Sequence, residues 1–285
     1  MPEPQSKTVS KYKADEHRGF TERPAAIDAQ SAGWLRALEA RHLADLRFPE
    51  VTRALRALSS AYVERRASLA SGAPLAGAGK RAAFALYYAP LHFMLVREIV
   101  GLLPGATAIG RTLVDLGCGT GAAGAAWAGA ATGRPAIVGL DRHPWAVAEA
   151  AWTYRVLSLS GQVRRCDIAR GPLPSGSAYL AAFTLNELTD DARARLKQML
   201  LARHHEGAAV LVVEPIARAV TPWWGEWTEG VLPAGGRVDE WRLHVELPSL
   251  LRKLATAAGL GTRALTARSI WMPGTGGGER AKVVR

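Results

Sequence analysis

A glycine-rich segment near the middle of the chain has the residue types of a ligand-binding turn. It reads Leu113-Val114-Asp115-Leu116-Gly117-Cys118-Gly119-Thr120-Gly121 and lies between an apolar strand pattern and an alanine-rich helix pattern. Glycine lets the backbone turn tightly and approach a ligand, and the helix that follows presents amide groups without intrahelical partners. The segment therefore predicts a site for a small polar ligand. Gly119, Gly121 and Gly124 also have the spacing of a dinucleotide site, so the glycines alone do not identify the ligand.

Three aspartates at the ends of predicted strands narrow the choice of ligand. Asp115 ends the first strand, where its carboxylate could engage the ammonium group of a methionine moiety and would repel a pyrophosphate. Asp141 ends the second strand, where an acid can accept hydrogen bonds from ribose hydroxyls. Asp167 ends the third and could accept from an adenine amino group, with Ile168 against the ring. Asp141 could instead be a surface residue and Asp167 a helix cap. The set favours S-adenosylmethionine over a nicotinamide dinucleotide.

The segments around these residues alternate between strand and helix patterns. Alternation of this kind predicts a parallel sheet covered by helices on both faces. The last two strands are expected to be joined without a helix and therefore to pair antiparallel. The predicted fold class is α/β, a doubly wound, mostly parallel seven-strand sheet with an antiparallel last strand. Its predicted strands are 112–116, 136–140, 162–166, 178–184, 208–214, 262–271 and 281–284.

Helical patterns precede this alternation. Apolar residues recur at near-helical spacing from Trp34 to Leu58, and again over 81–103 with a kink expected at Pro90. The sequence predicts a flexible tail over 1–29, a helical N-terminal region over 30–103 and a Rossmann-like domain over 104–285. Tyr88 and His92 could close over the ligand from the second of these helices, or belong to the core.

With these motifs the sequence resembles the class I, seven-strand S-adenosylmethionine-dependent methyltransferases. The resemblance covers about residues 80–285, and its first motif is the segment 114–121 quoted above. It implies a methyltransferase with S-adenosylmethionine as cofactor. It also implies that the methionine end would be surrounded by Asp115, Gly117, Cys118 and Gly119, the ribose by Asp141 and Arg142, and the adenine by Asp167 and Ile168.

A narrower resemblance concerns two later segments. Residues 182–188 and 212–215 resemble methyltransferase-like proteins associated with assembly of the mitochondrial small ribosomal subunit, and their bacterial relatives. This implies ribosomal RNA or a small ribosomal subunit precursor as the partner. The mitochondrial members resemble iron–sulfur proteins in carrying a cysteine cluster, which Cys118 and Cys166 alone cannot reproduce.

Candidates for the substrate side follow the fourth and fifth strands. Methyl transfer from a sulfonium is an in-line displacement that needs alignment and, for some nucleophiles, removal of a proton. Asn186 and Glu187 could orient or deprotonate a substrate, or cap the helix that begins near Thr189. Trp223 and Trp224 could form a lid that stacks on a substrate, or a hydrophobic plug under a long loop.

The composition of the chain narrows the choice of binding partners and of cellular location. A net charge of +11 favours attraction to a polyanion such as RNA, although it also fits a generally basic surface. Two cysteines exclude a disulfide scaffold, and His204-His205 lacks a third metal ligand, so no metal site is predicted. No apolar run predicts a membrane span, and no secretory signal is evident, so the expected location is cytoplasmic.

These features together predict an S-adenosylmethionine methyltransferase that acts on RNA or a ribosomal particle. One alternative keeps the cofactor but has a small aromatic metabolite as substrate, enclosed by the N-terminal helices and by residues 221–227, the tryptophan segment. Another is a ribosome-assembly protein that binds the cofactor without turnover. A nicotinamide-dependent oxidoreductase is the remaining alternative.

Overall fold

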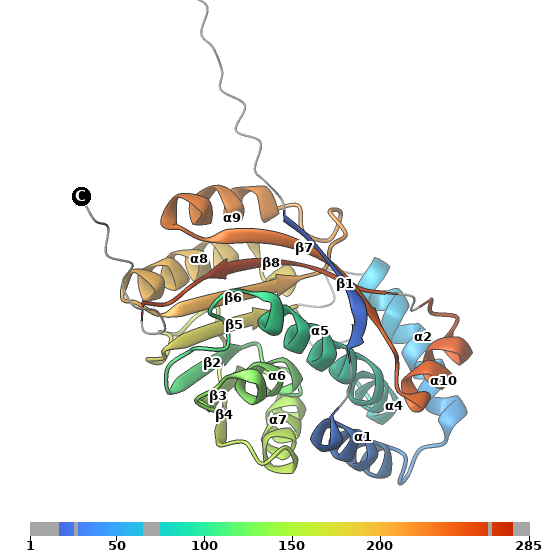
Figure 1. Cartoon of the computed structure of the whole chain (residues 1–285). Helices are drawn as coiled ribbons and strands as arrows, with labels where there is room; N and C mark the ends of the chain where they lie inside the picture. Colours follow the sequence, from blue (N-terminus) through green and yellow to red (C-terminus); the bar gives the residue numbers. More distant parts are fainter. Residues whose placement is uncertain (1–16, 26–27, 65–74, 262–263, 276–285) are drawn as a thin grey trace, which may run out of the picture.

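The centre of the protein is a twisted sheet in which eight strands lie side by side (Figure 1). The computed structural model describes residues 17–25, 28–64, 75–261 and 264–275, and the strands are counted within these ranges. In spatial order they are β1 (His17–Ala25), β7 (Arg237–Val245), β8 (Leu265–Met272), β6 (Ala209–Glu214), β5 (Ala178–Ala182), β2 (Thr112–Leu116), β3 (Ala136–Asp141) and β4 (Gly161–Arg165).

Strand directions confirm the predicted fold class. β8 runs antiparallel to both of its neighbours, β6 and β7, whereas the other neighbouring pairs are parallel. The seven strands from β2 to β8 therefore make a doubly wound sheet of six parallel strands with one reversed. β1 adds an eighth strand at the edge beside β7.

Two strands differ from the sequence-based expectation. β1 lies within the predicted tail, and β7 lies where no strand was expected, while the expected strand 281–284 falls outside the described residues. Helix α10 (Ser249–Ala258) joins β7 to β8, and the expected direct connection from the strand over 262–271 to a strand over 281–284 lies outside the described residues. β7 was hard to recognise because the buried Asp239, whose carboxylate accepts from Arg237 Nε at 2.9 Å, interrupts its apolar alternation.

Helices cover both faces of the sheet, as Figure 1 shows. α5 (Ala89–Leu102), α6 (Ala122–Ala130) and α7 (Pro144–Val156) contribute to a first apolar cluster, whereas α8 (Asp190–His205) and α9 (Trp224–Val231) contribute to a second. Successive strand residues point to opposite faces, so Leu113 belongs to the first cluster and Val114 to the second. Because helices cover both faces, a ligand-binding site is expected at the carboxyl ends of the parallel strands.

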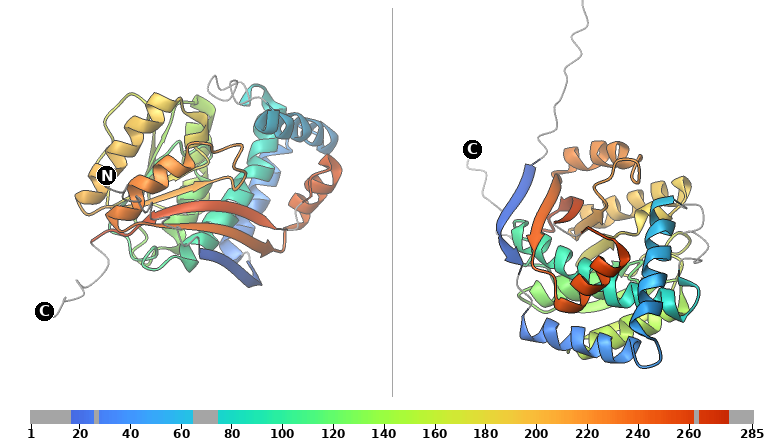
Figure 2. Two further views of the ribbon diagram at one scale, coloured as in Figure 1. Left: turned by 90° about the horizontal axis from the view of Figure 1, so that it is seen from above. Right: turned by 90° about the vertical axis from the view of Figure 1, so that its right-hand side faces the viewer.

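The N-terminal helices pack against the first of these faces. α2 (Phe48–Glu64) lies beside α4 (Ala78–Ala83) and α10 at one end of the molecule (Figure 2). α1 (Ala29–His42) is tied to α7 by the buried carboxylate of Glu149, which accepts from Arg41 Nε at 3.2 Å and lies 2.7 Å from His42 Nε2. The N-terminal region is thus an integral part of the core.

One continuous helix crosses the sheet face from residue 78 to residue 102. The π-helical turn η2 (Phe84–Tyr88) separates α4 from α5, and Pro90 sits in the first turn of α5, where its missing N–H disturbs the helical ladder. By length and composition this helix could cross a membrane, but 67% of its most apolar window is buried inside the protein. Burial of this extent is typical of the core helix of a globular domain.

Candidate active site

The turn after β2 is built around three glycines in left-handed backbone conformations. Gly117, Gly119 and Gly121 have φ values of 64°, 53° and 76°. A Cβ on Gly117 would lie 2.4 Å from Thr184 Cγ2, and one on Gly121 would lie 2.7 Å from Tyr154 Cε1. Both the conformation and the space therefore require glycine, as the sequence motif predicts.

Asp141 lies against this turn at the tip of β3. Its Oδ2 accepts a hydrogen bond from the Gly119 N–H at 2.9 Å, and its Oδ1 accepts from the His143 N–H at 2.8 Å. The side chain is partly exposed. Since each carboxylate oxygen has a second lone pair, Asp141 can still accept hydrogen bonds from two hydroxyl groups. Its position suits the predicted role at the ribose.

Asp115 lies beneath the turn. It is 1% exposed, and its Oδ2 accepts from the Gly124 N–H at 3.1 Å. A Cβ on Gly124 would come within 2.4 Å of that oxygen, which explains why the helix after the turn has glycine at this position. Burial raises the pKa of Asp115 to about 7, the Gly124 N–H opposes the rise, and the charge of Asp141 adds to it. Asp115 thus holds the turn through Gly124, and its expected contact with a ligand stays a prediction.

Cys118 lies at the back of the same turn. Its N–H donates to Leu140 O at 2.9 Å, and its side chain is buried. Burial, followed by the negative charges of Asp115 and Asp141, raises the pKa of the thiol. A thiol of this kind is unreactive, so Cys118 contributes shape and backbone to the turn.

The loop after β4 brings Asp167 and Ile168 to the next position along the edge. Asp167 Oδ1 accepts from the Ala169 N–H at 3.0 Å, and its Oδ2 lies 3.4 Å from Arg170 Nε. The bond to Ala169 closes a turn and does not cap a helix, because no described helix begins between β4 and β5, and the side chain stays partly exposed. Ile168 packs into the second apolar cluster. Arg142, directly after β3, is exposed.

A second turn follows β5 and touches the first. Thr184 Oγ1 donates to Leu116 O at 3.0 Å, at the end of β2. Phe183 has a φ of 57°, a strained value for a residue with a large side chain. The following residues form the short helix η3 (Leu185–Glu187), which places Asn186 and Glu187 on the same edge as Asp141.

Asn186 and Glu187 are not helix caps. Thr189 caps α8, because its side chain accepts from the Ala192 N–H. The Oδ1 atom of Asn186 is buried and has no hydrogen-bond partner among the described residues. Burial raises the pKa of Glu187 to about 7, with Arg142 opposing the rise and Asp141 adding to it. The charges of Asp141, at the first turn, and Glu187, at the second, are therefore close enough to affect each other.

Glu214 holds the second turn from the end of β6. It is fully buried, and its Oε1 accepts from the Leu185 N–H at 2.7 Å. Burial raises its pKa to about 8, while backbone N–H groups of Leu185, Thr184 and Asn186 oppose the rise. Glu214 belongs to the segment 212–215 of the narrower resemblance, but no role was predicted for it from the sequence. Its place at the end of an apolar strand, on the edge that carries the other acids, was the available signal.

Aromatic rings from the helix over 78–102 cover the two turns. The ring of His92 stacks on Phe183, with centroids 4.1 Å apart and planes 15° apart, and Tyr88 lies 6.3 Å from His92. Phe84, which sequence reasoning missed, is 3.9 Å from the place a Cβ on Gly119 would take. Burial lowers the pKa of His92 to about 4, so this ring is neutral. Tyr88 and His92 thus lie beside the second turn, and their expected role in closing over a ligand stays a prediction.

Trp223 and Trp224 do not lie at the site. Both are buried in the second apolar cluster, which fits the hydrophobic plug. The structure therefore corrects their assignment to the substrate side. The guanidinium of Arg193 lies 5.0 Å from the centre of the Trp223 ring. Arg193 in turn donates from Nε to Leu185 O at 2.9 Å. The tryptophan segment therefore supports the second turn from below.

Comparisons with known proteins give a distant likeness of fold. No protein-family profile matches the sequence, and no curated protein matches it. Among solved structures, mitomycin 7-O-methyltransferase MmcR is 18% identical with a TM-score of 0.48, covering 86% of this chain and 76% of that one. Plantazolicin methyltransferase BpumL, in complex with SAH, is 11% identical with a TM-score of 0.44, covering 85% of this chain and 100% of that one.

A third similar structure is much longer than the match. The Pyrococcus abyssi tRNA (uracil-54, C5)-methyltransferase, in complex with S-adenosyl-L-homocysteine, is 12% identical with a TM-score of 0.41. The match covers 65% of this chain but only 38% of that one. At such identities and scores, a functional assignment has to rest on the geometry of the site.

Proposed function

We propose that the protein is an S-adenosylmethionine-dependent methyltransferase that acts on RNA or a ribosomal particle. The observation that carries the proposal is the meeting of two turns at the carboxyl edge of the sheet. One turn has a glycine backbone with Asp141 at its side, and the other presents Asn186 and Glu187. A ligand held by the first turn would have its reactive end beside the second.

The residues at the first turn fit a sulfonium nucleoside. The left-handed glycines leave a cradle that side chains would fill, and Asp141 keeps lone pairs for a pair of ribose hydroxyls. A cation is also favoured by the negative charge that Asp141 and Glu187 place on this edge. A diphosphate would be repelled by the same two groups, which disfavours a nicotinamide dinucleotide.

The second turn supplies groups for the acceptor substrate. The cofactor, when bound, supplies an electrophilic methyl group. Glu187, with a pKa raised to about 7, is partly ionised at neutral pH and can take a proton from a nucleophile. Asn186 Oδ1 is a buried acceptor with no hydrogen-bond partner among the described residues, so it can orient an N–H or O–H group. The stacked rings of Phe183 and His92 form an apolar wall that limits the approach of water.

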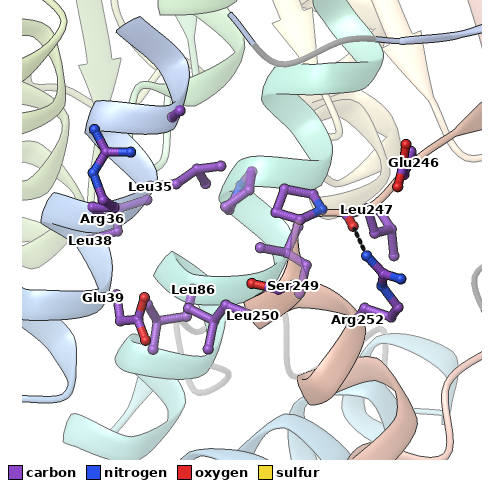
Figure 3. A pocket seen from close by; sticks show the side chains of 14 residues that line it. Leu35, Arg36, Leu38, Glu39, Leu86, Glu246, Leu247, Ser249, Leu250 and Arg252 are labelled. Carbon is purple, nitrogen blue, oxygen red and sulfur yellow. Dashed lines mark hydrogen bonds between the residues drawn. The ribbon is translucent and has the colours of Figure 1, made fainter. Parts of the chain in front are cut away.

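RNA is the favoured substrate because of charge. A net charge of +11 attracts polyanions, and exposed arginines such as Arg142 and Arg165 adjoin the site. The aromatic wall of Phe183 and His92 favours a second candidate, methylation of a small aromatic metabolite. However, a pocket of about 530 Å³ that would suit such a molecule lies between α1, η2 and the start of α10 (Figure 3). Its lining residues include none of the candidate site residues, so it lends that candidate no support.

Calorimetry tests the cofactor and a transfer assay tests the reaction. We expect S-adenosylhomocysteine to bind and NADH not to bind. We also expect transfer of labelled methyl groups from S-adenosylmethionine to small-subunit ribosomal RNA. Asp141→Ala should abolish both while keeping a cooperative thermal transition. Binding of NADH would overturn the proposal, and cofactor binding without turnover on any RNA or ribosomal precursor would favour an assembly protein instead.

A further inference from the structure

The geometry points to an RNA-binding surface beside the candidate active site, formed by Arg81, Arg142, His143, Trp145 and Arg165. We name it the arginine–tryptophan surface. It would bind the phosphate backbone and one base of a single-stranded RNA segment next to the nucleotide that is methylated. The inference deepens the proposed function and rests on it, because RNA is the substrate proposed there.

Three separate segments bring these residues together. Arg165 ends β4 and pairs in register with Asp141 of β3, so it starts directly beside the candidate ribose site. Its Nε donates to Arg142 O at 3.2 Å. Arg81 comes from α4, and its guanidinium carbon lies 5.9 Å from the centre of the Trp145 ring. The surface is therefore continuous with the edge that carries the two turns.

Two of the arginines keep most of their hydrogen-bonding capacity. Arg81 donates from Nε to Leu75 O at 3.0 Å, as Arg165 does to Arg142 O, and neither forms an ion pair with any described residue. A guanidinium has five N–H donors, and within the described part of the chain the four on the terminal nitrogens of each side chain have no hydrogen-bond partner. Fixed at Nε and open at the terminal nitrogens, such a group suits bidentate binding of a phosphate.

The charges around the surface are predominantly positive. Burial lowers the pKa of His143, and the positive charges of Arg81, Arg142 and Arg165 lower it further, while Asp141 opposes them. The oxygens of Asp141 are engaged by the backbone N–H groups of Gly119 and His143. An incoming anion would thus meet three guanidinium groups within reach of one imidazole.

An aromatic ring selects nucleic acid over other polyanions. Trp145 is partly exposed and stands edge-on to His143, with ring centroids 6.3 Å apart. Guanidinium groups beside an aromatic ring are the combination that single-stranded nucleic acid needs, because phosphates bind the cations and bases stack on the ring. An acidic peptide would use the arginines and gain nothing from the ring.

Fluorescence anisotropy with a short labelled oligouridylate tests the surface. The variant is Arg81→Gln/Arg165→Gln, and the matched control is Arg53→Gln/Arg242→Gln, which removes the same charge from exposed positions on α2 and β7. Losing two phosphate contacts should lower the slope of log K against log salt by about 1.4, and affinity about tenfold at roughly 0.15 M salt. The control should bind as the wild type does.

A second variant tests stacking. Trp145→Leu should weaken oligouridylate binding roughly fivefold or more without changing the salt slope, since no charge is removed. Wild-type RNA affinity in the double arginine variant would overturn the surface, and so would equal weakening by the control pair. Competition by polyglutamate as strong as by RNA would make an acidic protein the partner and overturn it too.

The cofactor readout separates this inference from the proposed function. S-adenosylhomocysteine affinity should be the same in the wild type and in Arg81→Gln/Arg165→Gln. If the wild type binds no S-adenosylhomocysteine but its RNA binding still depends on these arginines, the methyltransferase assignment fails and the surface stands. If the cofactor binds and the arginine variant binds RNA normally, the surface fails and the methyltransferase assignment stands.

Discussion

The turn after β2 and the turn after β5 leave the same edge of the sheet and touch each other, yet they are built in opposite ways. In the first, the left-handed positions are glycines, so backbone without side chains lines the turn. In the second, the left-handed position is Phe183, and the residues after it present side chains. Each turn has a buried acid beneath it, Asp115 for the first and Glu214 for the second.

From this difference we predict separate roles for the two turns, with the first binding the proposed cofactor and the second acting on the substrate. Glycine reaches left-handed conformations at little cost, so the first turn needs few supports to stay open. A phenylalanine in that region costs of order 1–3 kcal/mol and persists only where the surroundings hold it. Glu214, Arg193 and the stacked His92 provide that hold. We therefore expect changes at the second turn to affect the reaction rate and changes at the first to affect folding and cofactor binding.

The largest effect is expected from Glu187→Gln. Losing the group that accepts a proton should reduce methyl transfer to ribosomal RNA about 100-fold or more, while S-adenosylhomocysteine affinity stays as in the wild type. The wild-type rate should rise through about pH 7 as Glu187 ionises, and this limb should be absent in the variant. Asp191→Asn, on the exposed first turn of α8, is the control. A fully active Glu187→Gln enzyme would show that the acceptor needs no base.

Gly117→Ala tests the contact between the turns. Its Cβ would lie 2.4 Å from Thr184 Cγ2, in a backbone conformation with φ of 64°. The left-handed conformation and the overpacking should together lower the free energy of unfolding by about 2–4 kcal/mol, measured by urea denaturation. Gly129→Ala is the control, because nothing lies within 4 Å of its Cβ and it sits inside α6. That change should stabilise the protein slightly, by up to about 1 kcal/mol.

Glu214→Gln tests the support of the second turn through pH. The folded protein holds the proton of Glu214 up to about pH 8, whereas the unfolded chain releases it near the ordinary value of 4.5. Stability should therefore fall as pH rises between these values in the wild type, because the folded state binds the additional proton. The glutamine amide keeps an acceptor for the Leu185 N–H and cannot ionise, so its unfolding free energy should depend less on pH from 5 to 9. Identical pH profiles would refute the buried protonated acid.

The first turn could be predicted from sequence because its residue types dictate its geometry. Gly117, Gly119 and Gly121 are required by backbone conformation, and strand and helix patterns on either side place the turn at the sheet edge. The same alternation of patterns predicted the doubly wound sheet. Local sequence was sufficient there since neighbouring residues carry the constraint.

Features held by distant residues were missed or left open. β1 is a strand through pairing with β7, and β7 was concealed by the buried Asp239, which pairs with the partly exposed Arg237. In the sequence, Trp223, Trp224 and Trp227 fit a lid and a plug equally well, and only the face on which they pack decides between them. Asp115 has the right type and position for a ligand contact, but its burial beneath the turn depends on how closely α6 approaches β2.

The smallest effect is expected from Asp115→Asn, which separates holding the turn from holding the ligand. Asparagine keeps an oxygen that can accept from the Gly124 N–H, and it removes a carboxylate whose pKa is already raised to about 7. If the side chain only supports the turn, S-adenosylhomocysteine affinity should change less than about threefold, because less than 1 kcal/mol is lost when one acceptor replaces another of the same shape. A direct contact with the ammonium group would instead cost tenfold or more, since hydrogen bonds to charged groups contribute about 1.5–3 kcal/mol. Calorimetry at pH 8, where the carboxylate would be ionised, gives the larger difference between the two outcomes.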